Sequence, residues 1–375
     1  MNVHQEEATQ ALRGYDPQAL VVLDQGSRAG PALLPGTPTL IIDHHQSLVF
    51  PDGAVALSSY GHEPVATSSL LAYLCCCELH KGVKAACAWL AALGTMGDLG
   101  TSFKFTAPMP VDELNQAIKA GGGRKAFSTA VSLVNAPRRT AACDSSPAWE
   151  ALSAAAAARD IDPASRSAVP QAAQLQACRD EVSAAVDGAA RAPPRFSTDG
   201  RVALVRISSP CQIHPLIVTR WARSLKGKSL QVVVCANDAY LPGRVNFAAR
   251  IAQQGGGTAA LGKDSIDLIA LLKEAAGRQE GLREELGEDF ARGHAQATGG
   301  SVSPQAFERL CAALGLGGAG SGGGASGRGG GGGSAGKRGQ PVGKGGDEQV
   351  AMGQKRSRTL LQFGFTKQAA AAVET

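Results

Sequence analysis

The sequence lacks several features that mark common classes of protein. No apolar run approaches the roughly 20 residues needed to cross a bilayer, and residues 1–7 form neither a basic nor a hydrophobic leader. The nine cysteines are an odd number with no pair at CxxC spacing, so neither a disulfide framework nor a zinc ribbon is predicted. These absences favour a soluble, intracellular protein without a membrane partner, and they leave nucleus and cytoplasm open.

Length and charge indicate how the chain is divided. Its 375 residues, 44% of them apolar, are enough for two ordinary domains. The net charge of +5 is accounted for by the region after Leu316, which has eight Lys and Arg residues against three Asp and Glu. The rest of the chain is balanced, so binding of a polyanion there would depend on local patches of positive charge.

Glycine marks the clearest boundary. Seventeen of the 47 glycines lie between Gly317 and Gly346, which predicts a disordered glycine-rich linker over residues 317–350. Residues 351–375 then form a basic and apolar tail peptide, too short to fold alone. Its Leu360, Phe363 and Phe365 resemble the anchors of peptides that dock on replication sliding clamps, which makes a sliding clamp a candidate partner. The alternatives are an incidental apolar terminus or a weak nuclear-import signal.

Two short apolar runs predict strands in the first part of the chain. Residues 19–23 end at Asp24, and residues 39–42 end at Asp43. Continuous apolar character suits strands covered on both faces, as in a parallel sheet. Helical patterns follow at residues 67–79, with Thr67 or Ser68 as the cap, and at residues 84–93. On the first of these helices, the consecutive cysteines 75–77 are expected to be small apolar residues of a buried helix, not metal ligands.

Later segments alternate in the same way. Strands are expected at 201–207 and 230–235, and helices at 215–224, 266–276 and 304–314. Alanine-rich residues 140–198 predict a helical connector, with a helix at 171–191. The predicted fold class is α/β in two lobes: a parallel-sheet domain over residues 1–139 and a smaller α/β domain over residues 199–316.

The strand ends carry the candidate chemistry. Ligands collect at the carboxyl ends of parallel strands, where Asp24 and the tripeptide Asp43-His44-His45 are expected to meet. Asp98 adds a third carboxylate, in a glycine-punctuated turn expected after the second helix. Carboxylates with a few imidazoles suit Mn²⁺ or Mg²⁺, and two such ions would serve phosphoryl transfer. The alternatives are a helix N-cap for Asp24 and a satisfied turn with paired histidines for the tripeptide.

These motifs together resemble the DHH phosphoesterases, and the last of them is most similar to the RecJ-type single-strand exonucleases. The resemblance is carried by the strand ending at Asp24, the tripeptide at 43–45, the sequence TSSLLAYL at 67–74 and the sequence ALGTMGD ending at Asp98. It implies a two-metal site, usually with manganese, in which Asp24, Asp43, His44 and Asp98 are metal ligands. It also implies catalytic roles for His44 and His45, with His45 beside the ligands or on the scissile phosphate.

The resemblance continues in the second lobe and covers roughly residues 18 to 315. Gln212-Ile213-His214-Pro215, GRVNFA at 243–248 and GHAQATGG at 293–300 resemble the nucleic-acid-binding DHHA1 domain. This implies substrate binding by the second lobe. The candidate contact residues are Arg244, Asn246, His294, Gly299 and Gly300. An arginine fork suits a phosphate, and paired glycines permit close backbone approach.

Two departures from the family pattern affect these expectations. Members begin with a strand and a motif that supplies a His and two Asp residues to the metals, but residues 1–18 contain no such motif. The first domain is therefore expected to be incomplete at its N-terminus or to have lost part of its metal site. Arg292 also stands where the first glycine of a glycine-glycine-histidine signature is expected.

Three functions remain open at this stage. The leading hypothesis is a metal-dependent phosphodiesterase acting on single-stranded nucleic acid or short oligonucleotides. The second is a catalytically inactive nucleic-acid-binding or scaffold protein that keeps the fold. The third is a phosphatase for a small inorganic or cyclic-dinucleotide substrate, which the low aromatic content of 5% does not exclude.

Overall fold

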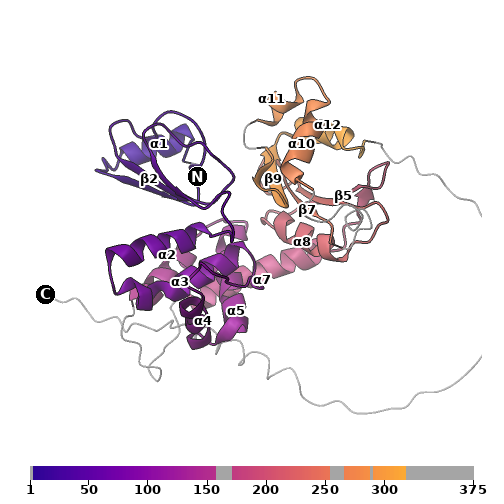
Figure 1. Cartoon of the computed structure of the whole chain (residues 1–375). Coiled ribbons are helices and arrows are strands. Elements are labelled where there is room, and N and C mark those ends of the chain that lie inside the picture. The colour runs from indigo at the N-terminus through magenta and orange to yellow at the C-terminus, as the bar shows by residue number, and fades with distance from the viewer. Residues whose placement is uncertain (1–2, 158–170, 254–265, 288–289, 318–375) are drawn as a thin grey trace, which may run out of the picture.

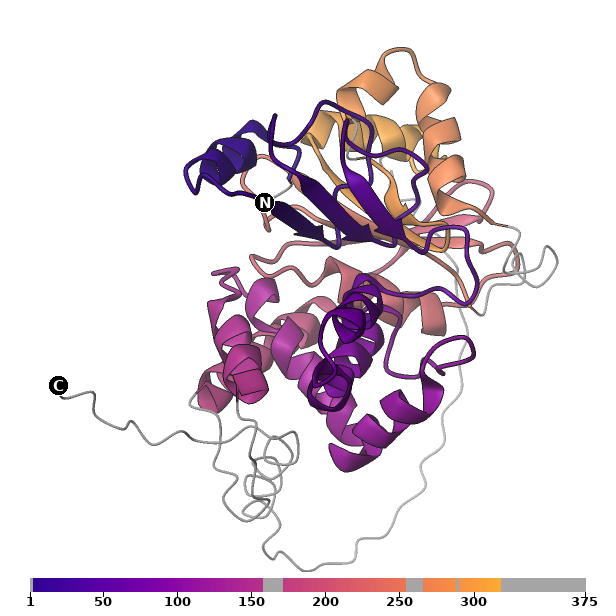
Figure 2. The same cartoon turned by 60° about the vertical axis from the view of Figure 1, so that its left-hand side comes forward.

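The computed structural model describes residues 3–157, 171–253, 266–287 and 290–317 (Figure 1). They form a small first sheet, a helical layer and a second lobe built on a larger sheet. Figures 1 and 2 both show the first sheet and the second lobe on the same side of the helical layer. The predicted α/β fold class is confirmed. The predicted linker and tail lie outside the described residues, so the sliding clamp stays a prediction.

The first sheet contains three parallel strands in the order β1-β2-β3. They are β1 (Leu20–Leu23), β2 (Thr39–Asp43) and β3 (Val55–Ser58), and helix α1 (Glu6–Arg13) precedes them. The two predicted strands are present at nearly the predicted bounds. Because β1 and β2 run parallel, both present their carboxyl ends, and therefore Asp24 and Asp43, at one edge.

The two faces of this sheet differ. On one face Leu20, Val22 and Ile41 are buried in a cluster with Leu33 and Leu34 from the loop between β1 and β2. On the opposite face, cross-strand neighbours form two apolar rows, which are Val21, Leu40 and Val55, and Leu23, Ile42 and Leu57. The outer members of both rows are exposed: Val21 by 56%, Val55 by 67%, Leu23 by 51% and Leu57 by 37%. The prediction that these strands are covered on both faces is therefore wrong for this face, where α2 contacts β2 and β3 but the residues of the outer strands stay exposed.

The helical layer has one large core. It contains α2 (Ser68–Leu79), α3 (Val83–Asp98), α4 (Val111–Ala120), α5 (Gly123–Asn135), the short 3-10 helix η1 (Pro137–Arg139), α6 (Ser146–Ala157) and α7 (Ala172–Ala189). Leu70, Met96 and Phe127 are among its fully buried side chains. Among the described residues of the alanine-rich segment, α6 and α7 are helical, as predicted, but α6 packs inside this core. Helix α7 joins two cores, with Leu175 in the helical layer and Val182 in the second lobe.

Two helices differ from their predicted form. Helix α3 continues to Asp98, so Asp98 lies in the last turn of a helix and not in the predicted loop. Gly94 is tolerated inside this helix because α2 packs closely there: an added Cβ would lie 2.5 Å from Ser69 Oγ. The N-cap of α2 agrees with the prediction: the side chain of Thr67 accepts the backbone N–H of Leu70. The prediction that cysteines 75–77 belong to a buried helix holds only in part: Cys77 packs against the helical core and Cys75 is half-buried, whereas Cys76 is exposed.

The second lobe has a six-stranded mixed sheet in the order β4-β5-β6-β7-β9-β8, in which β5 and β6 alone pair in parallel among the described strands. The strands are β4 (Arg195–Phe196), β5 (Val202–Ile207), β6 (Val232–Asn237), β7 (Val245–Ile251), β8 (Arg292–His294) and β9 (Ala297–Val302). Helix α8 (His214–Ser224) covers one face, where it packs with α7. The opposite face is covered by α10 (Leu268–Gly277), α11 (Leu282–Leu286) and α12 (Pro304–Ala313). This sheet is therefore buried on both sides.

Across the described part of the chain, none of the helices combines the length and the apolar character that a membrane crossing requires.

Candidate metal centre and interlobe cleft

The tripeptide after β2 forms a tight turn around the carboxylate of Asp43. Asp43 Oδ1 accepts the backbone N–H groups of His44 (2.8 Å) and His45 (3.3 Å) and lies 2.7 Å from His45 Nδ1, while Oδ2 accepts the N–H of Ser27 (3.3 Å). Burial alone raises the pKa of Asp43, but the hydrogen bonds from His45, Ser27 and His44 outweigh it and hold the pKa well below its usual value. Asp43 is thus an ionised carboxylate that fixes the turn and orients His45.

His44 is buried between two carboxylates. Its Nδ1 accepts the backbone N–H of Ser68 (3.0 Å) and lies 3.2 Å from Ser68 Oγ, so the first turn of α2 holds the ring. The same Nδ1 lies 3.6 Å from Asp24 Oδ1, and Nε2 lies 3.2 Å from Asp98 Oδ2. Because Nδ1 accepts the Ser68 N–H, the ring proton of a neutral His44 lies on the buried Nε2, beside Asp98 Oδ2. A cation bound at Nε2 would take the place of this proton.

Asp24 and Asp98 reach His44 from different elements. Asp24 directly follows β1, with its backbone N–H bonded to the carbonyl of Ile42 and a φ of +62°. Asp98 is the last residue of α3. Burial raises the pKa of Asp98, but the neighbouring imidazoles of His44, His294 and His45 together lower it, which keeps this carboxylate ionised.

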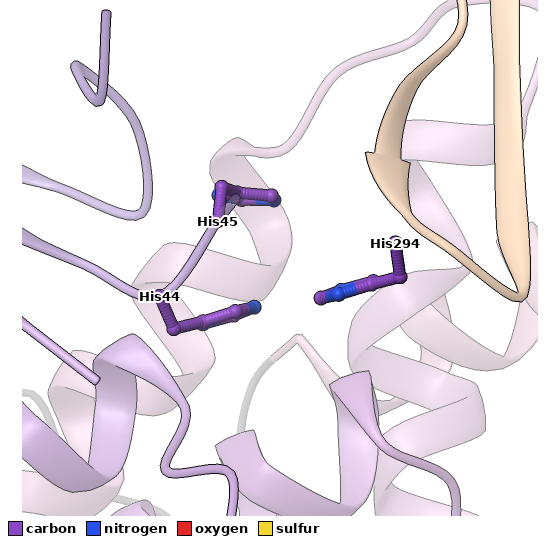
Figure 3. Close-up of side chains that lie close together, drawn as sticks. All are labelled: His44, His45 and His294. Atoms are coloured by element: carbon purple, nitrogen blue, oxygen red, sulfur yellow. The ribbon is translucent and has the colours of Figure 1, made fainter. Parts of the chain in front are cut away.

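A third histidine comes from the second lobe. His294, in β8, stacks on His44 with ring centroids 5.4 Å apart and on His45 at 5.8 Å, and His44 and His45 are themselves 4.7 Å apart. Figure 3 shows the three rings converging, with His294 presented by the β8-β9 hairpin. Burial lowers the pKa of His294, and the positive potential of the neighbouring His44, His45 and Arg250 adds to this against the opposing effect of Asp98. The second lobe therefore completes a site that the first lobe begins.

The donor set fits a divalent cation. The potential ligand atoms of Asp24, Asp43 and His44 lie within 4.8 Å of one another, as do those of His44, His45 and His294. Carboxylate oxygens with imidazole nitrogens suit Mn²⁺ or Mg²⁺. Asp24 and Asp98 are the freer carboxylates, because Asp43 already accepts four donors.

The predicted substrate residues of the second lobe separate in the structure. His294 joins the histidine cluster, whereas Arg244 precedes β7 and its guanidinium donates to the hydroxyl and carbonyl oxygens of Ser301. Gly299 and Gly300 lie in β9 against β7, where an added Cβ at Gly299 would be 2.3 Å from the carbonyl oxygen of Phe247. Asn246 is buried in β7, and its Oδ1 has no hydrogen-bond partner among the described residues.

Arg250 is a charged residue near the site that the sequence reasoning missed. It lies at the end of β7 opposite to Arg244, about 20 Å away for six residues of strand. Burial and the charge of Arg223 lower its pKa, against the opposing effect of Asp98, and Arg250 forms no ion pair with any described carboxylate. The sequence held one signal for it, because a period of two places Arg250 on the same strand face as Asn246.

A cleft of about 1390 Å³ opens from the candidate metal site between the lobes. Asp24, Asp43 and His45 line its first-lobe wall, and Lys273 and Arg283, from α10 and α11, line the opposite wall. Two positive side chains and one negative one, Glu284, therefore face the acidic strand ends across the cleft. This arrangement suits an anionic substrate that reaches from the metal site toward the second lobe.

Comparisons with known proteins bear on the fold. No protein-family model matches the chain, and no curated protein sequence is significantly similar to it. Among solved structures, the chain is similar to an exonuclease RecJ bound to manganese, with a TM-score of 0.51 and 14% identity over 83% of this chain and 77% of that one. It is also similar to RecJ from Thermus thermophilus in complex with Mn²⁺, with a TM-score of 0.56 and 15% identity over 82% of this chain and 46% of that one. The chain therefore has a RecJ-like fold and spans less than half of the second structure.

Proposed function

We propose that this protein is a divalent-metal-dependent phosphodiesterase that acts on single-stranded nucleic acid or short oligonucleotides. The observation that carries the proposal is the environment of His44, whose buried Nε2 lies 3.2 Å from Asp98 Oδ2 and whose ring is stacked against that of His294 from the other lobe. The RecJ structures that share this fold hold manganese, and the description of one of them as an exonuclease supports the substrate class.

Asp24, His44 and Asp98 would hold the cation, which is Mn²⁺ or Mg²⁺. A bound divalent cation supplies a Lewis acid for the phosphoryl oxygens and lowers the pKa of a water molecule. Asp43 has a positioning role in this proposal, because it keeps His45 in place through a 2.7 Å contact. It remains a candidate ligand by proximity.

His45 and His294, which both stack on His44, differ in their electrostatic environments. The hydrogen bond to Asp43 raises the pKa of His45 despite its burial, which favours its protonated form beside a phosphoryl group. The pKa of His294 is lowered by burial, so His294 is neutral near pH 7 and able to accept or donate one hydrogen bond. Arg250 and Lys273 would bind the remaining phosphates of the strand. Arg283 lines the same wall, but its guanidinium already donates to the carbonyl oxygen of Lys273.

One observation favours the alternative, a nucleic-acid-binding protein without turnover. Asp43 already accepts four hydrogen-bond donors, which leaves Asp24 and Asp98 as the freer carboxylates around His44. Two-metal phosphodiesterases use several acidic ligands to hold both ions. A site with two free carboxylates therefore fits one cation more readily than two.

The test measures metal binding and turnover separately. The full chain is titrated with Mn²⁺ in a calorimeter, and release of nucleotides from an end-labelled single strand is followed with and without the metal. Asp24→Asn and Asp98→Asn are each expected to weaken Mn²⁺ binding at least tenfold and to abolish release, because each removes one charged ligand. Asp52→Asn, at an exposed loop carboxylate, is the matched control.

The outcomes distinguish the hypotheses. Metal-dependent release that both site variants lose supports the phosphodiesterase. Mn²⁺ and single-strand binding without release by the unmodified chain supports the binding protein. Unchanged Mn²⁺ affinity in Asp24→Asn and Asp98→Asn would contradict the metal site itself.

A further inference from the structure

The first sheet has an apolar face that the proposed function does not use. We call it the open face and define it by the two cross-strand rows Val21, Leu40 and Val55, and Leu23, Ile42 and Leu57. Ile42 is buried, Leu40 is half-buried, and the four residues on the outer strands are exposed by 37–67%. None of the six lines the interlobe cleft.

Such a surface needs a partner. Strands of a parallel sheet are normally buried on both faces, and contiguous apolar patches on a soluble protein mark interaction sites. The opposite face of the same sheet follows this rule, with Leu20, Val22 and Ile41 buried. The open face is therefore incomplete in the described part of the chain.

We propose that the tail segment, defined as residues 354–367, docks on the open face of its own chain. Three features of the sequence support this occupant: an apolar pattern that matches a sheet face, a charge opposite to that of the first sheet region, and a tether long enough to reach it.

The apolar pattern has a period of two. Leu361, Phe363 and Phe365 alternate with Leu360, Gln362 and Gly364, so in an extended chain the first three side chains project to one side. An extended segment from Leu361 to Phe365 is about 13 Å long between its end Cα atoms, and the outer strands of a three-stranded sheet lie about 10 Å apart. Three apolar side chains on one side of the segment thus match the width of the open face.

Charge favours the same pairing. Residues 14–66, which contain the first sheet, have five acidic residues and a single basic one, Arg28. The tail segment has four basic residues, Lys355, Arg356, Arg358 and Lys367, and no acidic residue. Opposite net charges attract the two regions and make the association sensitive to salt.

The tether makes the association effectively intramolecular. About 40 residues, rich in glycine, separate Gly317 from Arg358, and a glycine-rich chain of that length has an r.m.s. end-to-end distance of about 35 Å. A domain of about 300 residues has a radius of gyration of about 19 Å, so a tether of this length reaches any face. Effective concentrations for such tethers are on the order of 1 mM, so a segment with a Kd of about 0.1 mM would be docked about 90% of the time.

The first experiment measures hydrogen exchange in the full chain with matched pairs of variants. Phe363→Ser is expected to raise amide exchange at residues 20–23 and 55–58 severalfold, because it removes a central apolar contact. Leu360→Ser, on the other side of the extended segment, is the control and is expected to leave these rates unchanged. On the sheet, Val55→Lys is expected to raise exchange at residues 359–365, whereas Leu48→Lys, at an exposed apolar residue outside the open face, is not.

A cross-linking experiment distinguishes the occupant. The photoreactive residue benzoylphenylalanine at position 363 of the full chain is expected to cross-link to residues 20–23 or 55–58 within the monomer, with a yield that falls as salt rises. Cross-links to this face confined to the dimer band would show that a second copy is the occupant and would overturn the proposal. Cross-links elsewhere, or equal exchange in Phe363→Ser and Leu360→Ser, would also overturn it. None of these outcomes depends on metal binding or phosphodiesterase activity.

Discussion

The two sheets of this protein resemble each other in sequence but differ in burial. In the second lobe, β5 and β6 are buried along nearly their whole length, because helices cover both faces. In the first sheet, β1 alternates between buried and exposed residues, and β3 is mostly exposed. Both regions have short runs of Val, Leu and Ile. An apolar run therefore predicts that a strand forms, but not what covers it.

The two sheets also contribute different parts of the candidate site. The first sheet contributes residues at its strand ends, Asp24 and Asp43, whereas the second contributes a surface and a hairpin that carries His294. We expect the second lobe to dominate stability and the first to dominate metal chemistry. The following predictions test this division, from the largest expected effect to the smallest.

The largest effect is expected in the core of the second lobe. Leu204→Ala, in buried β5, should lower the free energy of unfolding by about 2–5 kcal/mol, because it removes buried methyl groups and leaves a cavity. Leu23→Ala, in exposed β1, should lower it by about 1 kcal/mol or less. Urea denaturation of both variants measures the difference. Equal costs would break the comparison and show that the open face is covered in solution.

The second prediction concerns acid stability. His214, at the start of α8, is buried and its Nδ1 has no hydrogen-bond partner among the described residues; burial and the nearby Arg139 lower its pKa to about 4, and the ring of Tyr240 lies 6.2 Å away. The unfolded chain takes up this proton near the usual value of about 6.5. Stability from His214 is therefore fully present above pH 6.5 and is lost as the pH falls toward 4, by on the order of 3 kcal/mol.

Unfolding curves between pH 4 and 7 measure this dependence. His214→Gln should flatten it, because glutamine does not titrate, although the variant is less stable at pH 7. His62→Gln, at an exposed histidine, is the control and should leave the curve unchanged. An equally steep decline in His214→Gln would assign the acid sensitivity to other groups.

The third prediction concerns the residues that hold His44. Ser68→Ala removes the hydroxyl that lies 3.2 Å from His44 Nδ1 but keeps the backbone N–H. We expect about tenfold weaker Mn²⁺ binding by calorimetry, since groups that orient a metal-binding histidine contribute about 10- to 100-fold to affinity. Ser69→Ala changes the next residue of α2, which has no contact with His44, and should bind as the unmodified chain does. Equal affinities in the two variants would remove Ser68 from this role.

The smallest expected effect is a change in the salt dependence of single-strand binding, which distinguishes Arg250, in β7, from Arg244, in the turn before it. Arg250→Ala should make single-strand binding less dependent on salt, by about 0.7 units of slope in a plot of log affinity against log salt, if it neutralises one phosphate. Arg244→Ala should leave the slope unchanged, because its guanidinium is bonded to Ser301. Fluorescence anisotropy over a range of salt concentrations measures both slopes. The reverse result would return Arg244 to the substrate site.

The sequence by itself determined the local elements and the identity of the reactive groups. The strands ending at Asp24 and Asp43, the Thr67 cap and the last described helix follow from periodicity and capping, which depend on residues within one or two turns. The extent of α3 was missed, because Gly94 and Gly97 together indicate a break, whereas α2 packs so closely at Gly94 that a small residue is required there. Local patterns carry no information about such a partner.

Tertiary structure alone decided how the site is assembled. The stacking of His294 on His44 joins residues 250 positions apart, the four donors around Asp43 give it a positioning role, and Arg250 faces Asp98 from another lobe. The exposure of the apolar rows on the first sheet was also decided by tertiary structure, because the burial of a sheet face depends on which elements pack against it. Chain neighbours fix a backbone conformation through short-range sterics and hydrogen bonds, whereas contacts between distant residues depend on how whole elements pack.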